Sequence, residues 1–248
     1  MDGTLLDGDG RVPDAFWPLL ETARSRGITL APASGRQLAT LQQMFPDCED
    51  FIAENGAVVA RGGEVVSTTA LPEAPVQRLL SALPSAPFAA HAVVCAPSAA
   101  ATAALPPAVD AEVDKYYASR TLLGDGSASP TIKIALYVES DAERDAYPWV
   151  RELVPELRAV VSGKHWVDLM HPDADKGLAL AQLAEAMGVA MSETAAFGDY
   201  LNDLGMLRAA GHAVAMGNAH EDVKAVADEV VGTNTDGAAV ARLAKWLS

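Results

Sequence analysis

Residues 194–203, which read TAAFGDYLND, join an apolar strand to a cluster of polar side chains. The apolar run ends at Gly198, and Asp199, Asn202 and Asp203 follow at the spacing of a helical turn. A short apolar run with such an end is typical of a buried strand in a parallel sheet. Carboxylate and amide oxygens at a strand end can bind a hard cation. The two aspartates can equally be a pair that favours the positive end of a helix.

The segments on both sides of this stretch alternate between strand and helix signals. Such alternation with short connections predicts an α/β protein with a doubly wound parallel (Rossmann-like) sheet, in which ligands bind beyond the carboxyl ends of the strands. The predicted elements are helices over 13–26, 36–45, 176–187, 202–210, 221–227 and 236–247, and strands over 28–34, 51–59 with a following hairpin, 194–199, 212–217 and 228–232.

A segment of different composition interrupts this alternation. Residues 70–108 are rich in Ala, Pro and Ser, and the clearest strand that follows is TIKIALYV at 131–138. Together with strand signals near 90–96, 157–162 and 166–170 and a helix over about 141–153, this predicts an α+β module. We therefore expect a core domain of residues 1–66 and 167–248, with an inserted domain at 67–166.

Composition excludes several classes of protein. The 248-residue chain has a formal net charge of −15, which repels the nucleic-acid backbone and argues against general DNA or RNA binding. No apolar run approaches the roughly 20 residues of a membrane span, and no signal peptide is visible. The two cysteines suggest neither a disulfide framework nor a zinc site. These features predict a cytoplasmic protein with no nucleic-acid or membrane partner, and they leave its oligomeric state open.

Polar residues also follow the other predicted strands or open the helices after them. They are the DGT sequence at 2–4, SGR at 34–36 and Lys176 at the start of a helix. Taken singly, Ser34 can be a helix cap and Lys176 a solvated lysine. Taken together with residues 198–203, they supply the groups that phosphoryl transfer requires.

Each of these residues has a predicted role. Asp199, assisted by Asp203 and Asp2, would hold Mg²⁺. Asp2 would also give a proton to the leaving group and later activate water. Lys176 would place a positive charge on the phosphoryl group, and Ser34 and Asn202 would donate hydrogen bonds to it.

The SGR segment also contributes Gly35 and Arg36 to the predicted phosphate site. Arg36 can instead pair with a neighbouring acid. Glu54 and Asn55 either line the substrate end of the pocket or form a plain turn.

These motifs resemble the haloacid dehalogenase-like phosphatases, and within them the Cof-like branch. The resemblance extends over essentially the whole chain. It implies a Rossmann-like core and a four-stranded α/β cap that closes over the site and selects the substrate. The segments that carry the resemblance are DGTLLD (2–7), SGR (34–36), ENGA (54–57), KGLAL (176–180), GDYLND (198–203) and AMGNA (215–219).

The first motif departs from the family pattern. In the family it reads Asp-x-Asp-Gly-Thr after an apolar strand, and its first Asp is the nucleophile that forms a phosphoaspartate. Met1 matches the position x, so the nucleophile position lies one residue before Met1. The pair Asp7 and Asp9 is a poor substitute, because no strand precedes it and Arg11 stands where Thr belongs. We expect that the recorded start is set too late; the alternative is a catalytically inactive relative.

The sequence therefore predicts a Mg²⁺-dependent phosphatase that hydrolyses a small phosphorylated metabolite, such as a sugar phosphate, through a phosphoaspartate. Two alternatives stay open. One is an inactive relative that binds a phosphorylated ligand, and the other is a phosphotransferase or mutase of the same superfamily.

Overall fold

The computed structural model describes residues 1–117, 120–123 and 130–248. Contacts between Cα atoms divide the chain into two compact units. The first unit comprises residues 1–35, 44–66 and 175–248, and the second comprises residues 36–43 and 67–174. The two units are described separately below.

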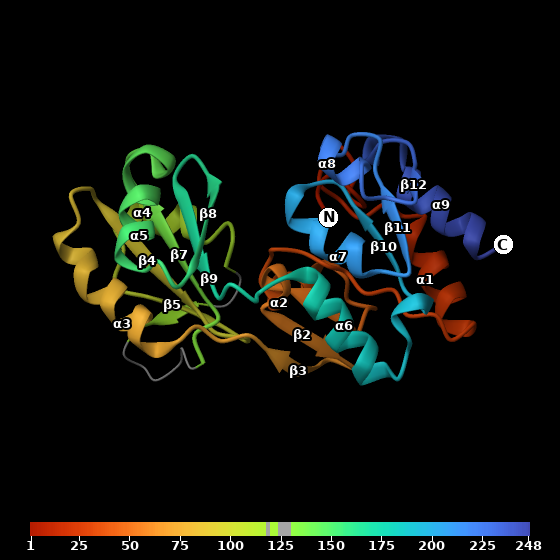
Figure 1. The fold of residues 1–248 in the computed structure, drawn as a ribbon, viewed down its shortest axis with the longest axis horizontal. Helices are drawn as coiled ribbons and strands as arrows, with labels where there is room; N and C mark the ends of the chain where they lie inside the picture. Colours follow the sequence, from red (N-terminus) through yellow and green to blue (C-terminus); the bar gives the residue numbers. More distant parts are fainter. Residues whose placement is uncertain (118–119, 124–129) are drawn as a thin grey trace. The chain divides into compact units, whose positions relative to one another are not determined.

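The first unit alternates strands with helices over most of its length (Figure 1). Its longest helix, α6, begins where the Asp175 carboxylate accepts hydrogen bonds from the backbone of Gly177 and Leu178, and it ends at Gly188 in the left-handed conformation. Its elements are α1 (Phe16–Ser25), β1 (Phe51–Ala53), η1 (Glu54–Gly56), β2 (Val58–Arg61), β3 (Glu64–Thr68), α6 (Lys176–Met187), η4 (Met191–Glu193), β10 (Ala195–Gly198), η5 (Leu201–Asp203), α7 (Leu204–Ala209), β11 (His212–Ala215), α8 (Glu221–Lys224), β12 (Glu229–Val230), η6 (Asn234–Asp236) and α9 (Ala238–Trp246).

A parallel sheet of order β10-β11-β12 forms the C-terminal part of the first unit. Gly198 at the end of β10 pairs with Ala215 of β11, so both strands end at the same edge. Helix α7 packs against the sheet through Met206 and Leu207, and Trp246 of α9 contacts Phe197 of β10 with ring centroids 5.2 Å apart. The residues after these strands therefore share one edge of the sheet.

A second sheet of order β1-β2-β3 contains the predicted hairpin. The predicted strand over 28–34 forms only one parallel bridge, between Ala33 and Ile52. Two backbone hydrogen bonds flank it, from Ser34 N to Ile52 O at 2.9 Å and from Ile52 N to Pro32 O at 3.0 Å. Pro32 has no N–H to extend the ladder, which limits the pairing here. The bridge nevertheless fixes Ser34 beside the end of β1.

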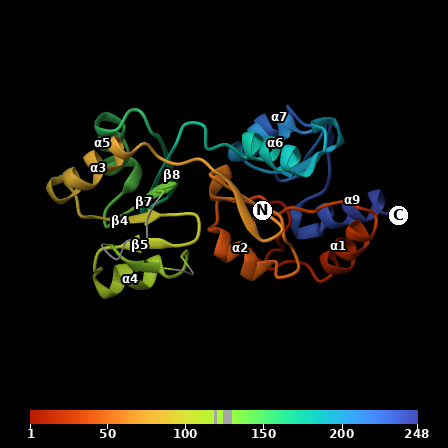
Figure 2. The same cartoon turned by 90° about the horizontal axis from the view of Figure 1, so that it is seen from below.

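The second unit is built on a six-stranded sheet of order β6-β5-β4-β7-β9-β8, in which β5 and β6 are parallel and the other neighbouring strands are antiparallel. Helices α3 and α5 lie on one face of this sheet and α4 on the other (Figure 2). The elements are α2 (Leu38–Met44), α3 (Glu73–Ala82), η2 (Leu83–Ser85), β4 (Ala90–Cys95), β5 (Ala100–Thr102), α4 (Pro107–Val113), β6 (Arg120–Leu122), β7 (Lys133–Val138), η3 (Ala142–Ala146), α5 (Tyr147–Leu153), β8 (Arg158–Gly163) and β9 (Trp166–Met170).

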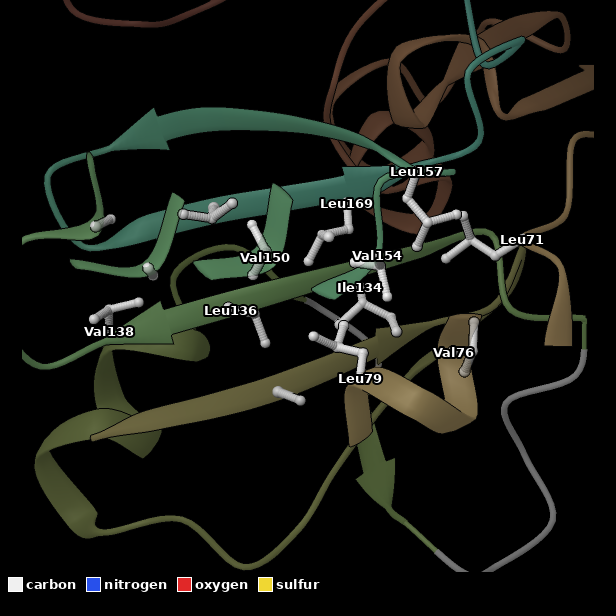
Figure 3. Packing of buried hydrophobic residues seen from close by; sticks show 14 residues of the cluster. Leu71, Val76, Leu79, Ile134, Leu136, Val138, Val150, Val154, Leu157 and Leu169 are labelled. Atoms are coloured by element: carbon white, nitrogen blue, oxygen red, sulfur yellow. The ribbon is translucent and has the colours of Figure 1, made fainter. Parts of the chain in front are cut away.

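Aliphatic side chains fill the space between this sheet and α3 and α5 (Figure 3). Ile134, Leu136 and Val138 alternate along β7 and are fully buried. They meet Leu79 of α3 and Val150 of α5 in one cluster. The period of two along the strand is the pattern expected of a sheet with one face in the core.

The predicted α/β class, with a parallel sheet in the core, is confirmed. Three details of the organisation differ from the prediction. The predicted boundary at residue 166/167 cuts through β9, which pairs with β7 and β8 and so belongs to the second unit. Residues 36–43, predicted in the core, group with the second unit, and its sheet has six strands where the family resemblance implied four. Within the described ranges, no helix has both the length and the apolar character that crossing a bilayer requires.

Candidate active site

Asp199 follows directly on the last residue of β10. Its side chain is 17% exposed, and its Oδ1 accepts a hydrogen bond from the hydroxyl of Thr4. The backbone nitrogen of Met1 lies 3.9 Å from the same oxygen. Gly3 packs so closely that a Cβ there would lie 2.2 Å from Asp199 Oδ2. The structure therefore brings the loop of residues 2–4 and the end of β10 together.

Two asparagine side chains hold the N-terminal loop in place. Asn218 Nδ2 donates to Gly3 O at 2.8 Å. Asn234 Nδ2 donates to Asp2 O at 3.2 Å and to Leu6 O at 2.9 Å. The two asparagines are linked because Asn234 N donates to Asn218 Oδ1 at 3.0 Å. We call Asn218 and Asn234 the asparagine latch.

Lys176 is the first residue of α6, and its side chain is buried. Its Nζ donates to Asp203 Oδ1 at 2.7 Å, and the two side chains are 2% and 4% exposed. Asp203 Oδ2 accepts from the backbone of Asp199 at 3.0 Å and of Tyr200 at 3.3 Å. One carboxylate thus connects the lysine to the loop that carries Asp199.

The charges of this pair stabilise each other. Burial raises the pKa of Asp203, but the Lys176 ammonium, the Met1 α-amino group and the backbone N–H of Asp199 together outweigh burial and bring the pKa below its usual value. Asp203 is therefore ionised at neutral pH. Both of its oxygens are already engaged, which argues against the predicted role of Asp203 as a metal ligand and favours a role in holding Lys176.

A close helix contact keeps Lys176 in position. Gly177, the next residue of α6, lies so near α7 that a Cβ would come within 2.4 Å of Gly205 O. Gly205 in turn faces the Asp175 carboxylate that caps α6. These two glycines allow α6 and α7 to approach at the site.

Ser34 and Asn202 are brought together through Asn55. Ser34 is buried, and its carbonyl accepts from Asn55 N at 3.0 Å. Asn202, which is exposed, donates from Nδ2 to Asn55 Oδ1 at 3.1 Å. A side chain at Gly35 would place its Cβ 2.9 Å from Asn55 Nδ2. Arg36 belongs to the segment 36–43 of the second unit, and its role stays a prediction.

The oxygen ligands of this site suit Mg²⁺. Across residues 1–117, 120–123 and 130–248, no three or more His, Cys, Asp or Glu side chains form a metal-binding group by themselves. Mg²⁺, however, commonly takes only one or two carboxylates and keeps several waters. Asp199, at the edge of the parallel sheet, fits that pattern, whereas the Asp203 oxygens are engaged by Lys176 and by backbone N–H groups. The metal-binding role of Asp2 stays a prediction.

In the first unit, these polar groups gather beyond the ends of the strands. This arrangement is typical of α/β proteins that bind ligands at the carboxyl edge of a parallel sheet. The sequence profile of the haloacid dehalogenase-like hydrolase family matches residues 1–243, so the chain belongs to this family. The predicted family is confirmed.

Individual relatives are named as phosphatases. The phosphatase YwpJ of Bacillus subtilis (strain 168) is 48% identical over 100 residues, which cover 40% of this chain and 35% of that protein. The HMP-PP phosphatase of Cronobacter sakazakii is 30% identical over 227 residues, covering 88% of this chain and 82% of that protein. The crystal structure of TM0651 from Thermotoga maritima has a TM-score of 0.84 and 26% identity, and the match covers 98% of this chain and 94% of that one. These names agree with the predicted class of phosphoric monoester hydrolases.

Three residues of the site were not assigned a role from the sequence. Thr4 lies in the quoted DGT motif and Asn218 in AMGNA, so both stood in segments that carried the family resemblance. Asn234 lies in a polar turn without any such motif. Its partners, Asp2 and Leu6, are more than 220 residues away in the chain, and nothing local indicates them.

Proposed function

We propose that this chain carries the active site of a Mg²⁺-dependent phosphatase that hydrolyses a small phosphorylated metabolite through a phosphoaspartate. The observation that carries the proposal is the convergence of Asp199, the Lys176–Asp203 pair and the Ser34–Asn55–Asn202 contacts in one unit. The relatives named above as phosphatases, one of them an HMP-PP phosphatase, support this substrate class.

The phosphoryl group would be held by neutral and positive donors. The Ser34 hydroxyl and the Asn202 amide donate hydrogen bonds to phosphoryl oxygens, and the Lys176 ammonium offsets their negative charge. Asp203 keeps that ammonium oriented. Mg²⁺, bound by Asp199, would supply further charge neutralisation in the transition state.

Two displacements would complete the reaction. In the first, the nucleophile carboxylate that the family's first motif supplies would form a bond to phosphorus, and the bond to the leaving oxygen would break. Asp2 gives that oxygen its proton. In the second, Asp2 takes a proton from water, whose oxygen attacks phosphorus, and the acyl phosphate bond breaks to regenerate the carboxylate.

The test compares hydrolysis of an aryl phosphate with Mg²⁺ by two proteins. Both contain an N-terminal apolar strand ending in Asp joined to Met1, and one also has Asp199→Ala. We expect turnover in the first protein and a loss of at least roughly 100-fold in the second. Equal rates in the two proteins would argue against the proposed function.

A further inference from the structure

The turn after β1 has a backbone conformation that is rare for residues with side chains. Three successive residues have positive φ: Glu54 at 51°, Asn55 at 56° and Gly56 at 96°. Among the non-glycine residues that the structure describes, Glu54 and Asn55 alone have positive φ. For a long side chain such as that of Glu54, this conformation costs on the order of 1 kcal/mol or more and persists only where its surroundings enforce it. Asn and Gly take positive φ readily in hairpin turns, so Glu54 is the residue whose conformation the connection of β1 to β2 would not ordinarily require.

The same turn touches three segments of the candidate active site. Asn55 N binds Ser34 O, and Asn55 Oδ1 accepts from Asn202 Nδ2 at 3.1 Å. Gly56 lies against the start of α6, where a Cβ would be 2.4 Å from Asp175 O and 2.8 Å from Lys176 N. The segments that carry Ser34, Lys176 and Asn202 thus meet on two consecutive residues, Asn55 and Gly56.

The contact with Asn202 has a consequence for phosphate binding. Asn202 is exposed, and a free amide on an exposed side chain samples several rotamers. Its Nδ2 carries two hydrogens, and Asn55 Oδ1 accepts one of them. The second hydrogen is then left in a fixed direction, available to a phosphoryl oxygen.

We propose that Asn55 is a positioning residue, which orients the Asn202 amide and anchors the Ser34–Gly35 backbone for phosphate, and that the left-handed turn exists to place it. This inference rests on the proposed function. Asn55 acts through its neighbours, and it does not need to touch the phosphoryl group.

The test separates the side chain of Asn55 from its backbone conformation. Asn55→Gly removes the amide and keeps the positive φ without strain, whereas Asn55→Ala removes the amide and adds strain. The matched control is Gly62→Ala in the β2–β3 turn: its φ of 58° is close to the 56° of Asn55, and a Cβ there meets nothing within 4 Å. Gly62→Ala reports the cost of a left-handed alanine away from the site.

Two measurements are made on the 248-residue chain and on each variant. The first is the dissociation constant for inorganic phosphate with Mg²⁺ present, from calorimetry. The second is the ¹⁵N order parameter of the Asn202 side-chain amide, from NMR relaxation. Melting temperatures accompany both.

We expect Asn55→Gly to weaken phosphate binding about tenfold, the effect of one lost hydrogen bond, and to mobilise the Asn202 amide. Gly62→Ala should lower the melting temperature and leave both other readouts unchanged. An Asn202 amide that stays as ordered in Asn55→Gly as in the parent chain would overturn the positioning role, whatever the affinity.

A separate outcome bears on the proposed function alone. If the parent chain and Ser34→Ala bind phosphate equally weakly, the phosphate site itself is wrong. The NMR readout still decides whether Asn55 orients Asn202.

Discussion

Each of the two units is stabilised internally by a different kind of contact. In the first unit, a buried lysine and a buried aspartate form an ion pair. Backbones also approach closely at Gly56 and Gly177, where a Cβ would lie 2.4 Å from a backbone oxygen. In the second unit, aliphatic side chains fill the space between a sheet and two helices. At Gly163 of this unit, an added Cβ would have its nearest neighbouring atom 3.6 Å away, which is an ordinary contact distance.

This difference indicates where each unit tolerates change. Close backbone contacts and buried charges have one correct geometry, and a substitution there breaks it. Aliphatic packing retains most of its stability when side chains of similar volume are exchanged. Close backbone contacts and buried charges suit a unit that must hold catalytic groups in a fixed geometry. Aliphatic packing leaves a unit free to vary its surface residues.

The buried ion pair is expected to give the largest effect. Lys176→Met leaves the Asp203 carboxylate buried without its partner, which costs about 3–5 kcal/mol in the free energy of unfolding. The double variant Lys176→Met/Asp203→Leu removes both charges and should recover much of that loss. Urea unfolding of the three proteins measures it.

The second unit provides a contrasting ion pair. Arg78 and Glu156 are 41% and 50% exposed, and exposed pairs contribute little. Arg78→Met should therefore change the unfolding midpoint far less than Lys176→Met. A larger effect at Arg78 would contradict the distinction between the units.

The pH dependence of stability should also distinguish buried from exposed carboxylates. The pKa of Asp203 is lower in the folded chain than in the unfolded chain, so its stabilising contribution is complete above roughly pH 4. That contribution is lost as the pH falls through the folded pKa. The free energy of unfolding, measured from neutral to acid pH, should fall in the parent chain and fall less steeply in Asp203→Asn.

Salt separates this effect from that of a surface group. Hydrogen bonds from Arg144 lower the pKa of Asp145 in the second unit, but these two side chains are 72% and 25% exposed, so salt screens their charges more than those of the buried Lys176–Asp203 pair. Asp203→Asn should reduce the pH dependence of the free energy of unfolding by a similar amount at low and high salt. Any reduction caused by Asp145→Asn should become smaller at high salt. Equal salt dependence of the two effects would contradict the difference in burial between Asp203 and Asp145.

The fold could be predicted because its signals are local. The apolar run before Asp199 and the helix that starts at Lys176 and stops at Gly188 lie within a few residues of α6 and β10 as the structure has them. The strand expected over 28–34 was less successful: apart from the bridge at Ala33, these residues form no regular strand. A strand depends on partners, and partners are not visible in the segment itself.

The site could be predicted in its residue types and less well in its connections. Asp203 was expected beside a cation because it lies one helical turn from Asp199. Its nearest cation is Lys176, 27 residues earlier in the chain, and that pairing occupies the carboxylate. The contact between Asn202 and Asn55 spans 147 residues. Such contacts follow from the tertiary fold, which a motif does not describe.

A smaller effect is expected from the glycine contact between α6 and α7. Gly177→Ala places a Cβ 2.4 Å from Gly205 O, so the two helices must separate, at a cost of about 1–3 kcal/mol. The matched variant Gly163→Ala, at the β8–β9 turn, has room for the methyl group and should cost less than about 1 kcal/mol. Urea unfolding compares them, and similar losses at both positions would contradict the close approach of α6 and α7.

The asparagine latch should give the smallest change in global stability and a clear local one. Asn234→Ala removes the donor to Asp2 O and Leu6 O, each bond worth about 1 kcal/mol, in a loop that can open without unfolding the unit. The amides of Thr4, Leu5 and Leu6, which all donate to Met1 O, should then exchange with solvent roughly tenfold faster.

Asn218→Ala should act on the same amides, and the double variant should change them less than the sum of the two, because Asn234 N binds Asn218 Oδ1. Arg144→Ala in the second unit is the control that should leave this exchange unchanged. Additive effects of the two asparagine variants would show that they hold the loop independently, so that the latch is two separate contacts.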